Sequence, residues 1–123
     1  MTGTKAVIAD DSPLMRAMMT KILQENNIEV LAEATNGEEA VKLFEMHKPH
    51  LMTLDIEMPK KMGTEVLEEL IEKYPDANII MVSSLSDARV IMKCLKTGAK
   101  RYIVKPFDDK AVMDAIRKVI KGS

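Results

Sequence analysis

The sequence predicts an α/β fold in which helices cover both faces of an open parallel sheet. Three observations support this prediction. Short apolar runs alternate with longer segments of helical periodicity along the chain. Most of the short runs are continuously apolar, which is typical of strands buried on both sides. No repeat, linker or low-complexity segment interrupts the alternation, so we expect one doubly wound domain over residues 1–123, with five strands and five helices.

The five predicted strands are short apolar runs that each end at a polar or turn-forming segment. They cover residues 6–9, 30–34, 51–54, 78–82 and 102–104. Four of these runs are followed directly by polar residues, namely Asp10 with Asp11, Asp55, Ser83, and Lys105. Because the carboxyl ends of parallel strands meet at one edge of the sheet, we expect these polar groups to lie close together.

The five predicted helices have recognisable start signals and apolar positions at i, i+3 and i+4 spacing. The predicted caps or first residues are Ser12 with Pro13, Asn36, Thr64, Ser86 and Asp108. The positions expected to face the core are Met15, Met18, Met19, Ile22 and Leu23; Ala40, Val41 and Phe44; Val66, Leu67, Leu70, Ile71 and Tyr74; Val90, Ile91, Cys94 and Leu95; and Val112, Ala115, Ile116, Val119 and Ile120. Gly98 is expected to end the fourth helix.

The composition is that of a folded domain without membrane or disulfide features. Hydrophobic residues make up 46% of the chain and charged residues 30%, which argues against disorder. The single Cys94 excludes an internal disulfide and a cysteine-based zinc site. No apolar stretch approaches membrane-spanning length, and no signal-peptide pattern precedes the first strand. We therefore expect a cytoplasmic protein.

The charged residues are unevenly distributed along the chain. Residues 1–86 carry 8 basic and 15 acidic side chains, a net charge of −7, whereas residues 87–123 carry 10 basic and 4 acidic, a net charge of +6. A solvated surface is the simplest interpretation of this basic C-terminal third. If it binds a partner, the scarcity of interleaved aromatic residues favours an acidic protein segment over nucleic acid.

The three aspartates at the strand ends predict a metal site. Like charges at short range repel unless they protonate or bind a cation, so Asp10, Asp11 and Asp55 call for a positive partner. Oxygen ligands select a hard ion, and a site with few protein ligands and room for water and phosphate suits Mg²⁺ better than Ca²⁺. Mg²⁺ and Lys105 together would balance the three carboxylates. A site whose charges balance in this way can accept a further anion.

A phosphoryl group is the anion that fits this site. The carboxylate of Asp55 is the predicted nucleophile toward phosphorus, while Lys105 and the metal would neutralise phosphoryl oxygens during in-line transfer. The hydroxyl of Ser83 would donate a hydrogen bond to a further oxygen. The product, an aspartyl phosphate, is a reactive mixed anhydride and therefore suits a transient signal.

Over the entire chain, these residues resemble the receiver domain of two-component response regulators. The matching motifs are the Asp10-Asp11 pair, Asp55 followed by Ile56-Glu57-Met58-Pro59 and Gly63, then Ser83, Tyr102 and Lys105-Pro106-Phe107. Among these regulators the chain looks most like the single-domain receivers of chemotaxis. The resemblance implies a flavodoxin-like five-stranded parallel sheet in the order 2-1-3-4-5, with five helices.

The resemblance also implies a role for each residue at the predicted site. Asp55 would accept a phosphoryl group from a phosphohistidine on a sensor kinase, and Lys105 would contact that group. Asp11, Asp55 and the backbone carbonyl of Glu57 would hold Mg²⁺, with Asp10 contributing through water. Such a protein is a phosphoacceptor switch rather than an enzyme, because it catalyses only its own phosphoryl transfer and dephosphorylation.

Further residues are implied to transmit or time the signal. Ser83 and Tyr102 would form a switch that reshapes the face made by the fourth helix, fifth strand and fifth helix, where a downstream target protein would bind. The peptide bond before Pro106 is expected to be cis. Glu57 and Leu85 occupy positions that influence access of hydrolytic water in this family. The added carboxylate of Glu57 and the bulky apolar side chain of Leu85 are expected to change the rate of hydrolysis in opposite directions or not at all. The sequence therefore does not predict the lifetime of the phosphoryl group.

Other functional classes fit the sequence less well. A haloacid-dehalogenase-type phosphatase needs a second aspartate two residues after the nucleophile, where this chain has Glu57. A GTPase phosphate-binding loop is missing, and few aromatic residues are present to stack on a flavin. An interaction module that is never phosphorylated stays open, as do a phosphorelay intermediate and a receiver excised from a longer regulator. We expect a monomer that binds neither nucleic acid nor membrane.

Overall fold

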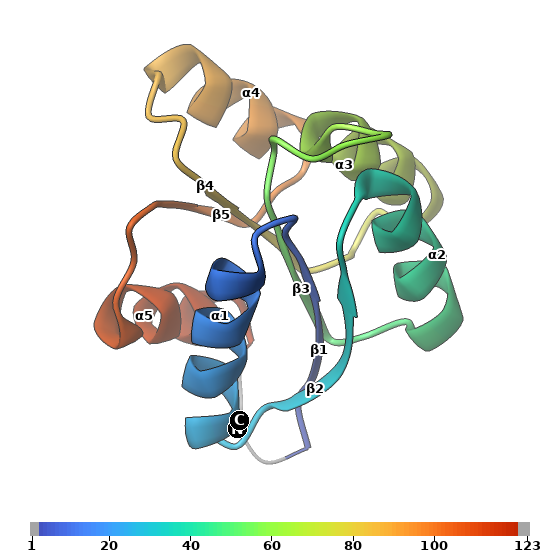
Figure 1. Ribbon diagram of the computed structural model, residues 1–123. Coiled ribbons are helices and arrows are strands. Elements are labelled where there is room, and N and C mark those ends of the chain that lie inside the picture. Colours follow the sequence, from blue (N-terminus) through green and yellow to red (C-terminus); the bar gives the residue numbers. More distant parts are fainter. Residues whose placement is uncertain (1–2, 121–123) are drawn as a thin grey trace.

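Five parallel strands form one sheet in the order β2-β1-β3-β4-β5, and a helix follows each strand (Figure 1). The computed structural model describes residues 3–120, so the predicted domain limits 1 and 123 lie outside the described residues. The elements are β1 (Lys5–Ala9), α1 (Pro13–Glu25), β2 (Glu29–Ala34), α2 (Gly37–His47), β3 (Leu51–Leu54), α3 (Gly63–Lys73), β4 (Ile79–Ser83), α4 (Ala88–Thr97), β5 (Arg101–Val104) and α5 (Asp109–Val119). The predicted fold class and strand order are confirmed, and the predicted strand bounds agree to within one residue.

Helices cover both faces of the sheet, and each face has its own apolar core. Residues of α1 and α5, including Leu23 and Ile116, pack against one face, whereas residues of α2, α3 and α4, including Phe44 and Leu67, pack against the other. Figure 1 shows the two helix layers on opposite sides of the strands. The central strands β1, β3 and β4 are therefore buried on both sides, which explains their continuously apolar sequences.

Most predicted helix starts are correct, and one is wrong. Ser12, Asn36 and Asp108 cap α1, α2 and α5, and each accepts a hydrogen bond from the backbone N–H three residues later. In α4 the cap is Asp87, which accepts the N–H of Arg89, and not the predicted Ser86. Two capping residues are adjacent here, and the charged carboxylate interacts more favourably with the positive end of the helix.

The prediction that Leu95 is buried in α4 is also wrong. Leu95 is 38% exposed and Met92 is 52% exposed, and Cys94 is the buried residue of this helix. Periodicity identifies the more apolar side of a helix, but it does not say how much of that side the rest of the fold covers.

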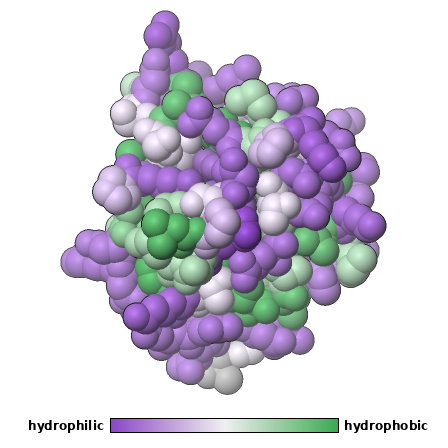
Figure 2. Space-filling view, in the orientation of Figure 1, coloured by the Kyte–Doolittle hydropathy of each residue, from purple (hydrophilic) through white to green (hydrophobic). Residues whose placement is uncertain are grey.

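The surface is dominated by polar side chains. Figure 2 shows a largely hydrophilic face, on which hydrophobic residues gather in small separate patches. Scattered exposed apolar residues of this kind are normal for a folded protein. Within residues 3–120, every helix is either too short or too polar to span a bilayer.

Candidate functional site

The ends of β1 and β3 place two carboxylates side by side. These strands are neighbours in the sheet, with Ala9 paired to Leu54, so the next residues, Asp10 and Asp55, leave the sheet at the same level. Backbone hydrogen bonds continue past the strand ends, because the N–H of Asp55 donates to the carbonyl of Ala9 at 2.9 Å. The rigid sheet therefore fixes where both carboxylates begin.

Asp10, Asp11 and Asp55 form one cluster of acidic side chains. Each contributes an oxygen, and these oxygens all lie within 4.8 Å of one another. Asp10 and Asp55 are each only 5% exposed, whereas Asp11 is exposed to solvent. The cluster thus has a buried floor and an open side. An arrangement of hard oxygen donors with access for water is suited to a divalent cation such as Mg²⁺.

Lys105 brings positive charge to the same cluster from the end of β5. Its Nζ donates a hydrogen bond to Oδ2 of Asp10 at 2.7 Å and lies 3.5 Å from Oδ2 of Asp55. The backbone N–H of Lys105 donates to the carbonyl of Ser83 at 2.8 Å, which anchors the residue to β4. The peptide bond between Lys105 and Pro106 is cis.

Burial and charge act against each other on these groups. Burial raises the pKa of Asp55, and the charge of Asp10 raises it further, while Lys105 opposes both effects. Burial alone would lower the pKa of Lys105, but its hydrogen bond to Asp10 and the charges of Asp55 and Asp10 outweigh that effect and raise it. The lysine is therefore held in its charged form, while Asp55 is a carboxylate whose negative charge is incompletely compensated.

The backbone of Leu85 is held by two residues of the predicted switch. Oγ of Ser83, a completely buried residue, accepts the N–H of Leu85 at 3.2 Å. The hydroxyl of Tyr102 donates to the carbonyl of Leu85 at 2.6 Å, and the half-buried ring packs against the core beneath α3 and α4. These contacts link the β4–α4 loop to both residues. The hydroxyl oxygen of Ser83 thus accepts a hydrogen bond from this loop.

Glu57 and Arg16 complete the surroundings of the cluster. The Glu57 side chain accepts a weak hydrogen bond from the Ser84 hydroxyl at 3.4 Å and is not part of the carboxylate cluster found among the described residues. Arg16 Nη1 donates to the carbonyl of Asp10 at 2.8 Å, and its Nε pairs with Glu33 at 3.2 Å. Sequence analysis missed Arg16. Its place on the first turns of α1, following Asp10, is a signal that could have found it.

The chain belongs to the response regulator receiver domain family, whose model matches residues 6–117. Members of this family are signalling modules rather than classical enzymes, and the resemblance inferred from the sequence is confirmed. The chain is 42% identical to the chemotaxis protein CheY of Listeria monocytogenes over 117 residues, covering 95% of this chain and 98% of that protein. It is 39% identical to CheY of Thermotoga maritima over 119 residues, covering 97% and 99%.

A solved structure agrees with these relatives. A chain in the crystal structure of the CheX-CheY-BeF3-Mg²⁺ complex from Borrelia burgdorferi superimposes with a TM-score of 0.94 at 33% identity. The match covers 98% of this chain and 92% of that chain. The fold and the near full-length similarity together define a CheY-like receiver domain.

Proposed function

We propose that this protein is a phosphoacceptor switch of chemotaxis-type signalling, in which Asp55 receives a phosphoryl group from a phosphohistidine on a partner kinase. The observation that carries the proposal is the convergence of three carboxylates with oxygens within 4.8 Å of one another and the Lys105 ammonium 3.5 Å from Asp55. The similarity to chemotaxis proteins supports this assignment and a cytoplasmic site of action. We assign the role to a single receiver domain over residues 1–123.

The donor set fits Mg²⁺. Hard carboxylate oxygens gather at one edge of the sheet, and the exposure of Asp11 leaves that side accessible to water. We propose that Asp11, Asp55 and the backbone carbonyl of Glu57 hold the ion, with Asp10 contributing through water. When bound, Mg²⁺ supplies positive charge for the oxygens of the phosphoryl group.

The chain's own residues define the transfer step. A carboxylate oxygen of Asp55 attacks phosphorus, so that a new O–P bond forms while the P–N bond to the donor imidazole breaks and the imidazole leaves with the electron pair. Lys105 neutralises charge on a phosphoryl oxygen, and its raised pKa keeps it protonated throughout. Hydrolysis of the aspartyl phosphate by water then restores the carboxylate.

The proposed signal passes through Ser83 and Tyr102. When the Ser83 hydroxyl turns to donate to a phosphoryl oxygen, the N–H of Leu85 loses the acceptor that now holds it. Tyr102 is bonded to the carbonyl of the same residue, so the β4–α4 loop and the tyrosine ring would respond together. This response would alter the face formed by α4, β5 and α5, which is a population shift between two arrangements of that face.

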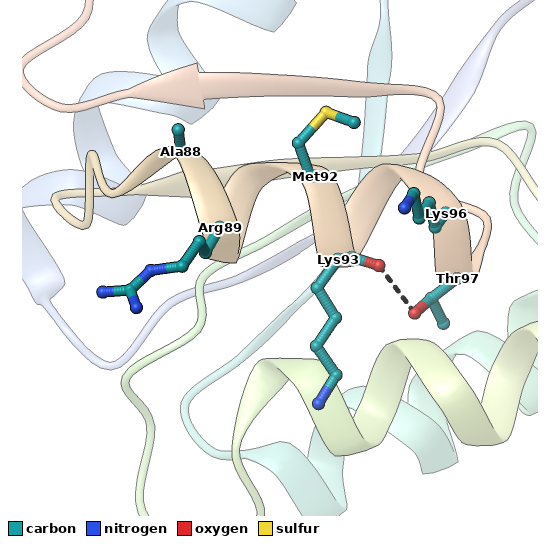
Figure 3. A pocket seen from close by; sticks show the side chains of 6 residues that line it. All are labelled: Ala88, Arg89, Met92, Lys93, Lys96 and Thr97. Carbon is teal, nitrogen blue, oxygen red and sulfur yellow. Dashed lines mark hydrogen bonds between the residues drawn. The ribbon is translucent and has the colours of Figure 1, made fainter.

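The outer surface of α4 supports the choice of an acidic partner segment. A groove of about 600 Å³ lies along this helix, lined partly by Arg89, Met92, Lys93 and Lys96. In Figure 3, Ala88 and Met92 project from one side of the helix, and Arg89 and Lys93 project from the other. An exposed methionine between basic side chains suits an amphipathic segment that carries both apolar and acidic residues.

Intact-mass measurement after incubation with a small-molecule phosphodonor tests the central claim. We expect a mass increase of one phosphoryl group that requires Mg²⁺ and disappears on treatment with a chelator before the donor is added. The Asp55→Asn variant should show no adduct. Asp76→Asn, at an exposed aspartate in the loop after α3, is the matched control and should be phosphorylated like the wild type.

The outcomes separate the proposed function from its alternative. Absence of an adduct in the folded wild-type protein would leave an interaction module that is not phosphorylated. An adduct that persists in Asp55→Asn would place the acceptor elsewhere. For the partner surface, Lys96→Glu should reduce capture of a target by the phosphorylated protein without changing the extent of phosphorylation.

A further inference from the structure

Gly37 lies against the loop that follows Asp55, although it carries no functional group. It is the first residue of α2, and its N–H donates to the carbonyl of Pro59 at 3.2 Å. A Cβ placed on Gly37 would lie 1.9 Å from the carbonyl oxygen of Lys61 and 2.5 Å from its Cβ. Both distances are far shorter than the 3.5–4.0 Å, roughly, of favourable carbon contacts. A larger residue at position 37 therefore displaces the loop.

The same loop is held at both of its ends. The N–H of Gly63 donates to the carbonyl of Ile56 at 2.8 Å, and a Cβ on Gly63 would lie 1.9 Å from the carbonyl oxygen of Asp55. Gly63 thus packs against the start of the loop at Asp55 and Ile56, and Gly37 packs against its middle at Pro59 and Lys61. Glu57 lies between these two supports. The path of its backbone, and with it the direction of its carbonyl, depends on both glycine contacts.

The turn between β2 and α2 also supports the first aspartate loop. The N–H of Asp10 donates to the carbonyl of Ala34 at 3.0 Å, just before this turn. Asn36 is 8% exposed and accepts the N–H of Glu39 at 2.9 Å, which fixes the start of α2 and hence Gly37. Residues 34–37 therefore contact both loops that carry the buried aspartates, without contributing a ligand themselves.

We propose that Gly37 is a positioning residue for the metal site: the β2–α2 turn sets Mg²⁺ affinity by fixing the path of residues 56–62. This inference rests on the proposed function, in which the carbonyl of Glu57 and the carboxylate of Asp55 hold the ion. Groups that orient metal ligands without touching the metal commonly account for about 10- to 100-fold in affinity. A displaced loop moves one ligand relative to the other and weakens binding by a factor of this order.

Isothermal titration of the unphosphorylated protein with MgCl₂ measures this effect without any phosphoryl transfer. We expect Gly37→Ala to weaken Mg²⁺ binding about 10- to 100-fold. Asn36→Ala removes the helix cap while keeping the glycine, so the turn is loosened and the affinity should fall by a smaller factor. Ala40→Gly is the matched control, because it weakens α2 at a buried position without placing any new atom against the loop. Its Mg²⁺ affinity should equal that of the wild type.

The outcomes distinguish the inference from the function on which it rests. A wild-type protein that does not bind Mg²⁺ contradicts the proposed function itself. The positioning role is overturned if the wild type binds Mg²⁺ and the folded Gly37→Ala and Asn36→Ala variants bind it as tightly as the wild type does. If Gly37→Ala does not fold, Asn36→Ala decides alone. Equal weakening in Ala40→Gly would show that general loss of stability is responsible, and would also overturn the proposal.

Discussion

α4 and α5 are both basic, amphipathic helices of the C-terminal third, yet the fold holds them very differently. α5 buries Val112, Met113 and Ile116 in the core that it shares with α1. α4 buries Cys94 and leaves Met92 and Leu95 exposed. In Figure 1, α4 stands apart from the α1 and α5 pair. Similar periodicity therefore produces different depths of burial. Of the two helices, α4 has less buried apolar surface, and it directly follows the loop that Ser83 and Tyr102 hold.

The largest expected effect comes from truncating the same residue type in the two helices. Ile116 is completely buried, and Ile116→Ala should lower the free energy of unfolding by about 2–5 kcal/mol. Ile91 of α4 is only partly buried, so Ile91→Ala should cost clearly less. Urea unfolding followed by circular dichroism measures both values. Equal losses would mean that α4 contributes as much to the core as α5 does.

Native-state cysteine labelling compares how often each helix opens. We expect the difference in opening free energy between the helices to be smaller than the loss caused by Ile116→Ala. The Cys94 thiol is 1% exposed and burial raises its pKa, so a thiol reagent reaches it only after α4 moves. Met113→Cys in a Cys94→Ala background places a thiol at a site that is 2% exposed in α5. We expect Cys94 to react at least about tenfold faster, equivalent to about 1.4 kcal/mol of opening free energy. Slower labelling of Cys94 would reverse the comparison.

The contrast between α4 and α5 also marks what the sequence could and could not predict. The meeting of Asp10, Asp55 and Lys105 follows from local signals, because parallel strands must end at one edge of the sheet. The strand order is predicted from the resemblance to receiver domains and not from local signals. The exposure of Leu95 could not be predicted, since it depends on what α4 packs against in space. Loop contacts pose the same problem, as the approach of Gly37 to residues far along the chain shows.

The predicted switch residues show the same division at finer scale. Ser83 and Tyr102 were identified through the resemblance to receiver domains, and they lie at the end of β4 and within β5. Their shared partner, the backbone of Leu85, is not recognisable, because a main-chain acceptor or donor has no sequence signature. Side-chain chemistry at strand ends is thus predictable, whereas contacts made by loop backbone require coordinates.

Asp55→Asn should stabilise the protein without touching either helix, by less than Ile116→Ala destabilises it. Burial raises the pKa of Asp55 above its ordinary value of 3.8, so the ionised carboxylate costs folding free energy at neutral pH. As the pH falls through the raised pKa toward 3.8, the folded state takes up the proton first and this cost disappears. The gain from Asp55→Asn should therefore be present at pH 7 and vanish in acid.

Urea unfolding at several pH values, without Mg²⁺, measures the stability gained by Asp55→Asn. Cysteine labelling of the same variant tests whether the substitution changes how often α4 and α5 open. Because the substitution acts on the site, Cys94 should still react faster than a cysteine at position 113 in the Asp55→Asn background. A gain that persisted unchanged below pH 3.8 would show that ionisation of Asp55 is not its cause. Loss of the labelling difference would show that the site, and not packing, determines how often α4 opens.

Met92→Ala should have the smallest effect on stability and the most selective effect on binding. Met92 is 52% exposed on the outer surface of α4, so its truncation should change the free energy of unfolding by no more than about 0.5 kcal/mol. Met113→Ala, at a buried position of α5, is the matched control and should be much more destabilising. If the groove on α4 receives a partner, Met92→Ala should weaken capture of that partner while phosphorylation at Asp55 proceeds normally. Normal capture by Met92→Ala would exclude this methionine from the docking surface. Partner binding would then not explain why α4 is poorly buried.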